Sequence, residues 1–274
     1  MRVVIINNHS EKSIQVSNRL RELLIEENMV IDPLLPEIVI SVGGDGTLLS
    51  AFHRYAHILD KVRFIGVHTG HLGFYTDWRE YNLNELVKQM VNDNEEAVQY
   101  PLLDVIIKYK NKDEEKHYLA LNESILRYTN GTLVCDVYIQ DELFERFRGD
   151  GLCISTPTGS TGYNKSVGGA VLHPRLEALQ VTEIASLNNR VFRTLSSPIV
   201  IAPDEWITLK PMNTSTISLS VDQLSAKEKN VEEVKLRIAD ERISFARYDH
   251  THFWDRVENA FLGVKRHNEF DLDS

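Results

Sequence analysis

Residues 36–59 read PEIVISVGGDGTLLSAFHRYAHIL, and this stretch decides the fold of the first part of the chain. The apolar run 36–42 predicts a buried strand, and the spacing of apolar residues over 47–59 predicts an amphipathic helix. The turn GGDG separates them. A glycine-rich turn between a strand and a helix offers free backbone N–H groups, which together with the helix N-terminus bind phosphate. The stretch therefore predicts a strand, a phosphate-attracting turn and a helix.

The same alternation extends over residues 1–100. We expect further strands at 2–6 and 62–69 and further helices at 10–28 and 82–93. Alternating strands and helices are typical of a parallel sheet, in which ligands bind beyond the carboxyl ends of the strands. The chain contains neither GxGxxG nor GxxxxGK[ST]. These residues are predicted to form a Rossmann-like α/β nucleotide-binding domain without the usual dinucleotide signature.

From residue 101 to residue 250 the pattern changes to short strand-like runs separated by turns. Such runs predict an all-β, sandwich-like domain. One helix is expected within it, from Leu176 to Ala185. The polar segment 92–99 suits a linker, and residues 251–274 are expected to form a C-terminal extension with a short helix and an acidic end.

Composition excludes several classes of protein. The formal net charge of -10 argues against a nucleic-acid partner, because phosphate backbones attract basic surfaces. No apolar run has the length of a membrane span, and the N-terminus lacks the apolar core of a signal peptide. Cys135 and Cys153 are the only cysteines and are expected to be reduced core residues. We expect a cytoplasmic protein with no membrane partner.

Asp45 poses a chemical question, because a carboxylate in an anion-attracting turn would repel a bare phosphate. The conflict disappears if Asp45 accepts the proton of a hydroxyl group, or if it faces a metal ion that bridges it to phosphate. Both arrangements describe phosphoryl transfer to an alcohol. The alternative is that Asp45 caps the following helix, and the short motif alone leaves both possibilities open.

A second loop, STPTGSTGYNKSVGGA at residues 155–170, favours phosphoryl transfer. Its hydroxyl groups offer donors and acceptors, and its glycines permit close approach of a ligand to the backbone. Such a loop can hold a sugar, a base edge or phosphate oxygens. The alternative is a polar turn whose hydroxyl groups bind their own backbone.

Two shorter motifs also place polar groups at strand ends. LALNES delivers Asn122 and Glu123 to the end of an apolar run, and FRGDGL places Arg148 and Asp150 beside glycines. Arg148 could hold phosphate through two parallel hydrogen bonds, and Asp150 could accept from an amino group on a base. The alternative for FRGDGL is a hairpin turn with an ion pair.

The histidines do not indicate a zinc site. His53 and His57 have the i, i+4 spacing of a helix, and His68 and His71 flank a glycine turn. The chain has no HExxH and no CxxC motif, so we expect no structural metal site. The pair on the helix is expected to face solvent.

Taken together, GGDG, NES, RGDGL and STPTGSTGYNKS occur in the order and spacing seen in the NAD kinases, and HTGHLGF is similar to that family's next glycine turn. The chain resembles the short bacterial members over nearly its whole length. The resemblance implies an α/β domain followed by a β-sandwich-like domain. It also implies transfer of the γ-phosphoryl group of ATP to the 2′-hydroxyl of the adenosine ribose of NAD, with Mg²⁺ or another divalent cation. The implied partners are NAD and ATP or polyphosphate, in a homodimer or homotetramer.

The resemblance also implies roles for individual residues. Asp45 would be the base that accepts the hydroxyl proton, Gly46 would adjoin the ribose, and Asn122 and Glu123 would hold ribose and base groups. Further residues implied in substrate binding are Arg148, Asp150, Thr158, Thr161, Gly162, Tyr163, Asn164, Lys165, Ser166, Ala185 and Gln223. Among these, Asp150 and Ala185 are expected at the second base, and Arg148 is expected to reach a site in a neighbouring subunit.

The chain departs from the family pattern at two positions. Gly162 stands where alanine is common, and Gln223 stands where relatives carry histidine. Glutamine donates a hydrogen bond but does not titrate near neutral pH, so the pH dependence of such relatives does not transfer. Two other functions stay open: a lipid or sugar kinase with a similar glycine–aspartate loop, and a non-catalytic dinucleotide sensor.

Overall fold

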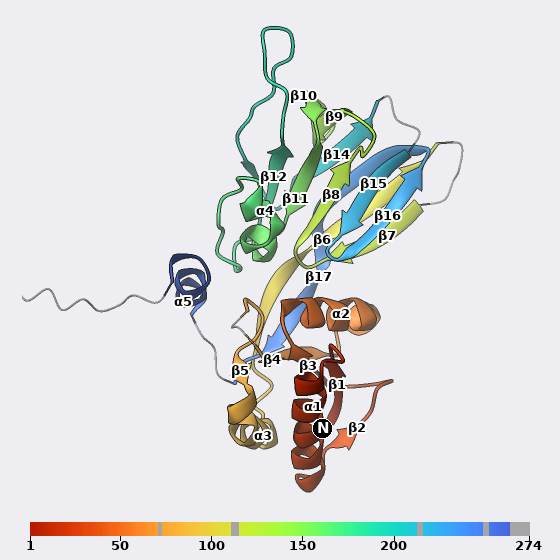
Figure 1. Cartoon of the computed structure of the whole chain (residues 1–274). Coiled ribbons are helices and arrows are strands. Elements are labelled where there is room, and N and C mark those ends of the chain that lie inside the picture. Colours follow the sequence, from red (N-terminus) through yellow and green to blue (C-terminus); the bar gives the residue numbers. More distant parts are fainter. Residues whose placement is uncertain (71–72, 111–114, 213–215, 249–251, 264–274) are drawn as a thin grey trace, which may run out of the picture. The chain divides into compact units, whose positions relative to one another are not determined.

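The computed structural model describes five stretches of the chain (Figure 1): residues 1–70, 73–110, 115–212, 216–248 and 252–263. By their internal contacts the residues fall into two compact units. The first unit takes residues 1–48, 65–96 and 247–274, and the second takes 49–64 and 97–246. Because the units interleave along the chain, the sequence boundaries predicted at residues 100 and 250 stay predictions.

The first unit contains the expected parallel sheet. Strand β1 (Arg2–Asn7) pairs in parallel with β2 (Val30–Ile31) and β3 (Ile38–Gly43), and β4 (Arg63–His68) pairs in parallel with β5 (Trp78–Arg79). The sheet order is β2-β1-β3-β4, with β5 beside β4. All six residues of β3 are buried, which explains its continuous apolar sequence.

Three α-helices follow strands as the sequence predicts. They are α1 (Glu11–Glu26), α2 (Asp45–Tyr55) and α3 (Leu83–Val91), and short 3₁₀ turns cover Ala56–Ile58 and Glu80–Asn82. The Ser10 side chain accepts from the backbone N–H of Ser13 and so caps α1. Near the end of the chain lie α5 (Phe253–Val257) and a π-helical turn (Glu258–Leu262). The acidic end predicted for the extension 251–274 falls within residues 264–274, which lie outside the described residues.

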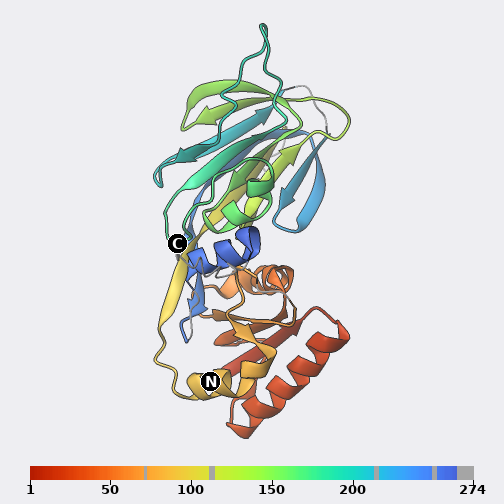
Figure 2. The same ribbon diagram turned by 60° about the vertical axis from the view of Figure 1, so that its left-hand side comes forward.

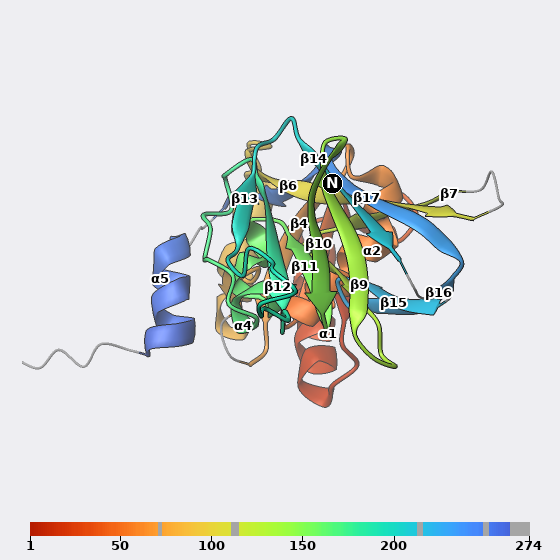
Figure 3. The same cartoon turned by 90° about the horizontal axis from the view of Figure 1, so that it is seen from above.

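The second unit is the antiparallel β-sandwich that the sequence predicts. Figures 2 and 3 show its strands from two further sides. The first sheet has the order β10-β9-β14-β17-β6-β7, with strands β6 (Ala97–Tyr109), β7 (Glu115–Ala120), β9 (Leu133–Ile139), β10 (Glu142–Gly149), β14 (Trp206–Pro211) and β17 (Val231–Ala246).

The second sheet of the sandwich has the order β13-β12-β11-β8-β15-β16. Its strands are β8 (Glu123–Arg127), β11 (Gly151–Ser155), β12 (Leu179–Ile184), β13 (Ile199–Ile201), β15 (Thr216–Val221) and β16 (Leu224–Lys229). Side chains from both sheets form one apolar core. Both cysteines are free and buried in this unit.

One expectation about secondary structure is wrong. The helix predicted from Leu176 to Ala185 is instead the strand β12, which lies between β11 and β13. Five of the six residues of β12 are buried, Gln180 and Thr182 among them, so its alternation of apolar and polar residues does not mark a solvent-facing side. The only helical turns near the hydroxyl-rich loop, among the described residues, are a 3₁₀ turn (Thr158–Thr161) and α4 (Tyr163–Ser166).

The alternative for FRGDGL, a hairpin turn, is excluded by the strand pairing. Strand β10 pairs with β9 in one sheet, whereas β11 pairs with β8 and β12 in the other. The turn at Gly149–Gly151 therefore carries the chain from one sheet to the other, and the two strands do not form a hairpin.

Candidate functional site

Asp45 is the first residue of α2, and its carboxylate binds backbone groups of a different loop. Oδ2 accepts from the N–H of Phe74 at 2.9 Å, and Oδ1 accepts from the N–H of Tyr75 at 3.1 Å. A Cβ atom at Gly73 would lie 2.1 Å from Oδ1, so only glycine lets the carboxylate approach so closely. Helix capping is thus not the use of this side chain. The space around Gly46 is open, because a Cβ there would meet no atom within 4 Å.

In the second unit the motifs NES and STPTG lie against each other. The hydroxyl of Thr156 donates to the carbonyl of Leu121 at 2.6 Å, and the backbone N–H of Thr156 donates to the carbonyl of Asn122 at 2.9 Å. A Cβ atom at Gly159 would lie 2.1 Å from the same Asn122 carbonyl oxygen. Two motifs that are more than thirty residues apart in the sequence are therefore joined through the backbone carbonyls of Leu121 and Asn122.

Some hydroxyl groups in this loop form hydrogen bonds with backbone groups of the loop itself or of residues close to it in the sequence. Thr156 Oγ1 also accepts from the N–H of Gly159 at 3.0 Å, and Ser160 Oγ accepts from the N–H of Leu172 at 2.8 Å. Seven buried side-chain polar atoms have no hydrogen-bond partner among the described residues, and three of the seven lie on these two motifs: Glu123 Oε2, Thr158 Oγ1 and Asn164 Nδ2. Buried polar atoms are rarely left without hydrogen bonds, so these three are candidates to bind a polar ligand.

Asp222 organises this region, and the sequence reasoning missed it. Its side chain is 0% exposed. Oδ1 accepts from the N–H groups of Asn122 at 2.7 Å and Glu123 at 3.2 Å, and Oδ2 accepts from the N–H of Leu121 at 2.9 Å. His53 Nε2 donates to Oδ2 at 2.9 Å. His53 is therefore not a solvent-facing residue as expected; His57 is exposed, and His71 lies outside the described residues.

A signal for Asp222 was present in the sequence. Asp222 and Gln223 form the turn between β15 and β16, and Asp222 has the left-handed φ of 52° that aspartate tolerates better than most residues. Its neighbour Gln223 donates through Nε2 to Ser50 Oγ at 2.8 Å. An aspartate in a hairpin turn is common, however, and nothing in the sequence shows what its carboxylate contacts.

Glu123 has an unusual protonation equilibrium. Burial and, to a smaller extent, the nearby negative charge of Asp222 raise its pKa to about 8. The side chain is 8% exposed. At neutral pH the carboxyl group is therefore largely protonated, and it can donate one hydrogen bond as well as accept.

The other predicted residues fall into two groups. Thr161 is buried, whereas Gly162, Lys165 and Ser166 are exposed. The hydroxyl of Tyr163 accepts a hydrogen bond from Arg127, and the Arg127 guanidinium also lies 5.1 Å from the centroid of the Tyr163 ring. These five residues belong to the same loop as Thr158 and Asn164.

Arg148, Asp150 and Ala185 form the second group, around the turn between the two sheets. The Arg148 guanidinium lies 4.1 Å from the centroid of the Phe192 ring, Asp150 is exposed, and Ala185 has a left-handed φ of 47°. The N–H of Asp150 donates to the carbonyl of Ile184 at 2.9 Å. This turn precedes Gly151, and Glu123 pairs with Ser155 at the other end of β11. At about 3.3 Å per residue the two groups are separated by about 13 Å along that strand.

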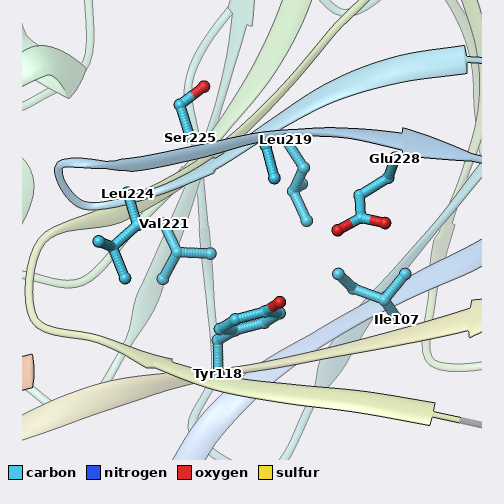
Figure 4. A pocket seen from close by; sticks show the side chains of 8 residues that line it. Ile107, Tyr118, Leu219, Val221, Leu224, Ser225 and Glu228 are labelled. Atoms are coloured by element: carbon cyan, nitrogen blue, oxygen red, sulfur yellow. The ribbon is translucent and has the colours of Figure 1, made fainter.

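A pocket of about 140 Å³ lies elsewhere in the sandwich (Figure 4). Strands β6, β7, β15 and β16 supply its lining, which is mostly apolar. Its carboxylate, Glu228, is satisfied by the hydroxyl of Tyr109 at 2.7 Å and by Lys116 Nζ at 3.0 Å. None of the predicted site residues lines this pocket.

Within the described residues, no group of three or more His, Cys, Asp or Glu side chains could hold a metal ion. Across the same residues, no helix has the length and apolar character that crossing a membrane requires.

Comparison with known proteins identifies the family. The model of the ATP-NAD kinase N-terminal domain matches residues 31–95, and that of the ATP-NAD kinase C-terminal domain matches residues 121–248. The chain belongs to the ATP-NAD kinase family. The resemblance seen in the motifs is thereby confirmed.

Individual members of the NAD kinase family are similar over almost the whole chain. The NAD kinase of Enterococcus faecalis is 60% identical over 263 residues, which cover 96% of this chain and 99% of that protein. The NAD kinase of Latilactobacillus sakei is 58% identical over 265 residues, with coverage of 97% and 99%. The family membership argues against the lipid or sugar kinase alternative.

Solved structures of the family share the fold. Yeast NADH kinase complexed with NADH superimposes with a TM-score of 0.84 at 20% identity, covering 100% of this chain and 90% of that one. The NAD kinase from Archaeoglobus fulgidus in complex with ATP gives a TM-score of 0.75 at 23% identity, with coverage of 96% and 98%. The α/β and β-sandwich arrangement expected for an NAD kinase is confirmed.

Proposed function

We propose that this chain transfers the γ-phosphoryl group of ATP to the 2′-hydroxyl of the adenosine ribose of NAD, giving NADP and ADP. The observation that carries the proposal is the set of buried polar atoms at Glu123, Thr158 and Asn164 that have no partner within the described structure. They lie on NES and STPTGSTGYNKS, two of the motifs by which the chain resembles the NAD kinases. A dinucleotide would supply the missing hydrogen bonds.

Asp45 is the proposed general base. Each carboxylate oxygen has two lone pairs, and one on each is used by the N–H groups of Phe74 and Tyr75. The remaining lone pairs can accept the proton of the ribose hydroxyl. The open space at Gly46 leaves room for the ribose beside the carboxylate. The two backbone hydrogen bonds hold the carboxylate in one orientation before the substrate arrives, which lowers the cost of reaching the reactive geometry.

Asn122 and Glu123 are proposed to bind ribose and base groups of NAD, together with Thr158 and Asn164. A protonated Glu123 suits this role, because a ribose hydroxyl or a base edge offers both donors and acceptors. Thr161, Gly162, Tyr163, Lys165 and Ser166 complete the proposed pocket. Gln223 contributes its side-chain amide as a hydrogen-bond donor, and this amide stays uncharged at every pH at which the protein would be assayed.

Arg148, Asp150 and Ala185 are proposed to serve a different part of the assembly. The length of β11, about 13 Å, separates them from Glu123. That separation supports the proposal that they face the second base or a neighbouring subunit, in a homodimer or homotetramer. We further propose that the protein is cytoplasmic and acts without a nucleic-acid or membrane partner, as its net charge of -10 suggests.

Mg²⁺ is proposed to accompany ATP. Mg²⁺ in phosphoryl transfer is held by one or two carboxylates together with substrate phosphates and water. Asp45 is the one carboxylate of the glycine turn and would be the protein ligand, with the ATP phosphates supplying the others. The ion would neutralise charge that develops on the transferred phosphoryl group. Polyphosphate stays a possible alternative donor.

The test is NADP formation from NAD, ATP and Mg²⁺ by the wild type and by Asp45→Asn. We expect the variant to bind NAD and to lose about 10²- to 10⁴-fold in kcat, because general-base catalysis contributes about that much. Calorimetric titration with NAD separates binding from chemistry. A wild type that binds NAD but forms no NADP with ATP or polyphosphate would refute the kinase proposal and favour the dinucleotide sensor.

A further inference from the structure

The segment Gly73–Asp77 is bound from a second side by a buried arginine near the end of the chain. Arg256, in α5, is 4% exposed. Its Nη1 donates to the carbonyl of Gly73 at 3.0 Å and to that of Thr76 at 3.3 Å, and its Nη2 bonds to the carboxylate of Asp77. A buried charge is costly unless its donors are satisfied, and here the described partners are all on this one loop.

The carbonyl of Gly73 and the N–H of Phe74 belong to the same peptide group. The N–H donates to Asp45 at 2.9 Å, and the carbonyl accepts from Arg256 at 3.0 Å. In a trans peptide these two groups point in opposite directions. A single peptide group is therefore held between a carboxylate and a guanidinium, and hydrogen bonds in such a chain polarise and strengthen one another.

Packing supports the same connection. The Phe74 ring lies 6.4 Å from the Phe253 ring and 5.7 Å from the Phe261 ring, centroid to centroid. Thr76 Oγ1 accepts from the N–H of Gly73 at 3.2 Å, which closes the turn. Burial lowers the pKa of Arg256 to about 10, while the negative charge of Asp45 acts in the opposite direction. Arg256 therefore carries its positive charge at neutral pH, and the negative charge of Asp45 stabilises that charged form.

We propose that Arg256 is a positioning residue for Asp45: it fixes the Gly73–Phe74 peptide, whose N–H orients the carboxylate toward the substrate hydroxyl. The inference rests on the proposed function of Asp45 as the base. Arg256 does not contact the reacting atoms; it acts through one peptide group. The C-terminal helix is therefore part of the catalytic apparatus, although 183 residues separate Arg256 from Gly73.

Arg256→Gln and Arg256→Lys test the proposal, with Arg19→Gln as the matched control. Arg19 lies in α1, where its exposed guanidinium pairs only with Glu22 among the described ion pairs, at 3.2 Å. We expect Arg256→Gln to lower kcat about 10- to 100-fold, since a small misplacement of a catalytic group costs about that much, with KM for NAD changed less than about 3-fold. Arg256→Lys should recover part of the rate, because it keeps the charge but loses the forked geometry. Arg19→Gln should match the wild type.

A measurement that needs no turnover accompanies the kinetics. The N–H groups of Phe74 and Tyr75 donate to Asp45 and should be protected from hydrogen exchange. We expect faster exchange at these two amides in Arg256→Gln, with wild-type exchange in strands β1 and β3. If the wild type forms no NADP, the proposed function fails, and the exchange data still decide whether Arg256 controls the contacts of Asp45.

Two outcomes would overturn the inference. One is wild-type kcat together with wild-type exchange at Phe74 and Tyr75 in Arg256→Gln. The other is faster exchange throughout β1 and β3, since that would show that Arg256 stabilises the unit as a whole and has no specific effect on the loop.

Discussion

Asp222→Ala should destabilise the protein and weaken dinucleotide binding together. The carboxylate accepts from three consecutive backbone N–H groups, those of Leu121, Asn122 and Glu123, and from His53. Removing it leaves all four donors without this acceptor in a place where the side chain is 0% exposed.

The magnitude follows from these contacts. A hydrogen bond to a charged group contributes about 1.5–3 kcal/mol, so four of them set an upper bound of about 6–12 kcal/mol. The turn can relax and water can enter the cavity, which reduces the cost. We expect about 3–5 kcal/mol for Asp222→Ala, the range found when one partner of a buried charged network is removed. Asp222→Asn keeps one acceptor oxygen and should cost roughly half as much.

Urea unfolding of the purified protein measures the stability change, and calorimetric titration measures NAD binding. The control is Asp240→Ala, because Asp240 is exposed on β17 in the same unit. We expect the control to lie within about 0.5 kcal/mol of the wild type. The reasoning would be refuted if Asp222→Ala were as stable as the control, or if it lost stability while binding NAD as tightly as the wild type.

Two further predictions concern Glu123 and the loop that contacts Asn122. Because the pKa of Glu123 is raised to about 8 in the folded state, the folded protein keeps a proton that the unfolded chain loses above about pH 4.5. The free energy of unfolding should therefore fall by up to about 1.4 kcal/mol per pH unit as the pH rises toward 8. Glu123→Gln should remove that slope in urea titrations at pH 5, 6.5 and 8. Equal slopes in the two proteins would contradict this. Gly159→Ala should cost about 1–3 kcal/mol or more and impair NAD binding, because its Cβ would overlap the Asn122 backbone. Gly162→Ala should cost less than Gly159→Ala, because its Cβ would meet the Gly159 carbonyl oxygen at 3.2 Å and a small shift relieves that contact. Similar melting temperatures for the two variants would count against the argument.

Much of the architecture could be predicted from local patterns. The continuous apolar run of β3 and the amphipathic spacing of α2 predict a strand and a helix from contacts within a few residues. The same reasoning failed at β12, where the polar residues Gln180 and Thr182 are buried and hydrogen-bonded to Ala170 and Asn164. Local patterns therefore predict an element only where burial follows the polarity of its residues, as it does in β3 and α2.

The candidate site divides in the same way. Asp45, Asn122 and Glu123 could be identified because they interrupt apolar runs at the ends of strands, and because their motifs occur in a fixed order along the chain. Sequence could show that a carboxylate at residue 45 needs a hydroxyl or a metal ion. It could not show that two backbone N–H groups already hold that carboxylate.

The sequence by itself determined the two kinds of fold, the family and the residues that carry the proposed chemistry. Only the tertiary structure decided how those residues are held: Asp222 lies 169 residues from His53, and Arg256 lies 183 residues from Gly73. Neither contact follows from periodicity or motif, because a hydrogen bond between distant residues depends on where the chain topology brings their atoms. A buried charge must find its partners within about 3 Å, and only the folded chain specifies which groups are that near.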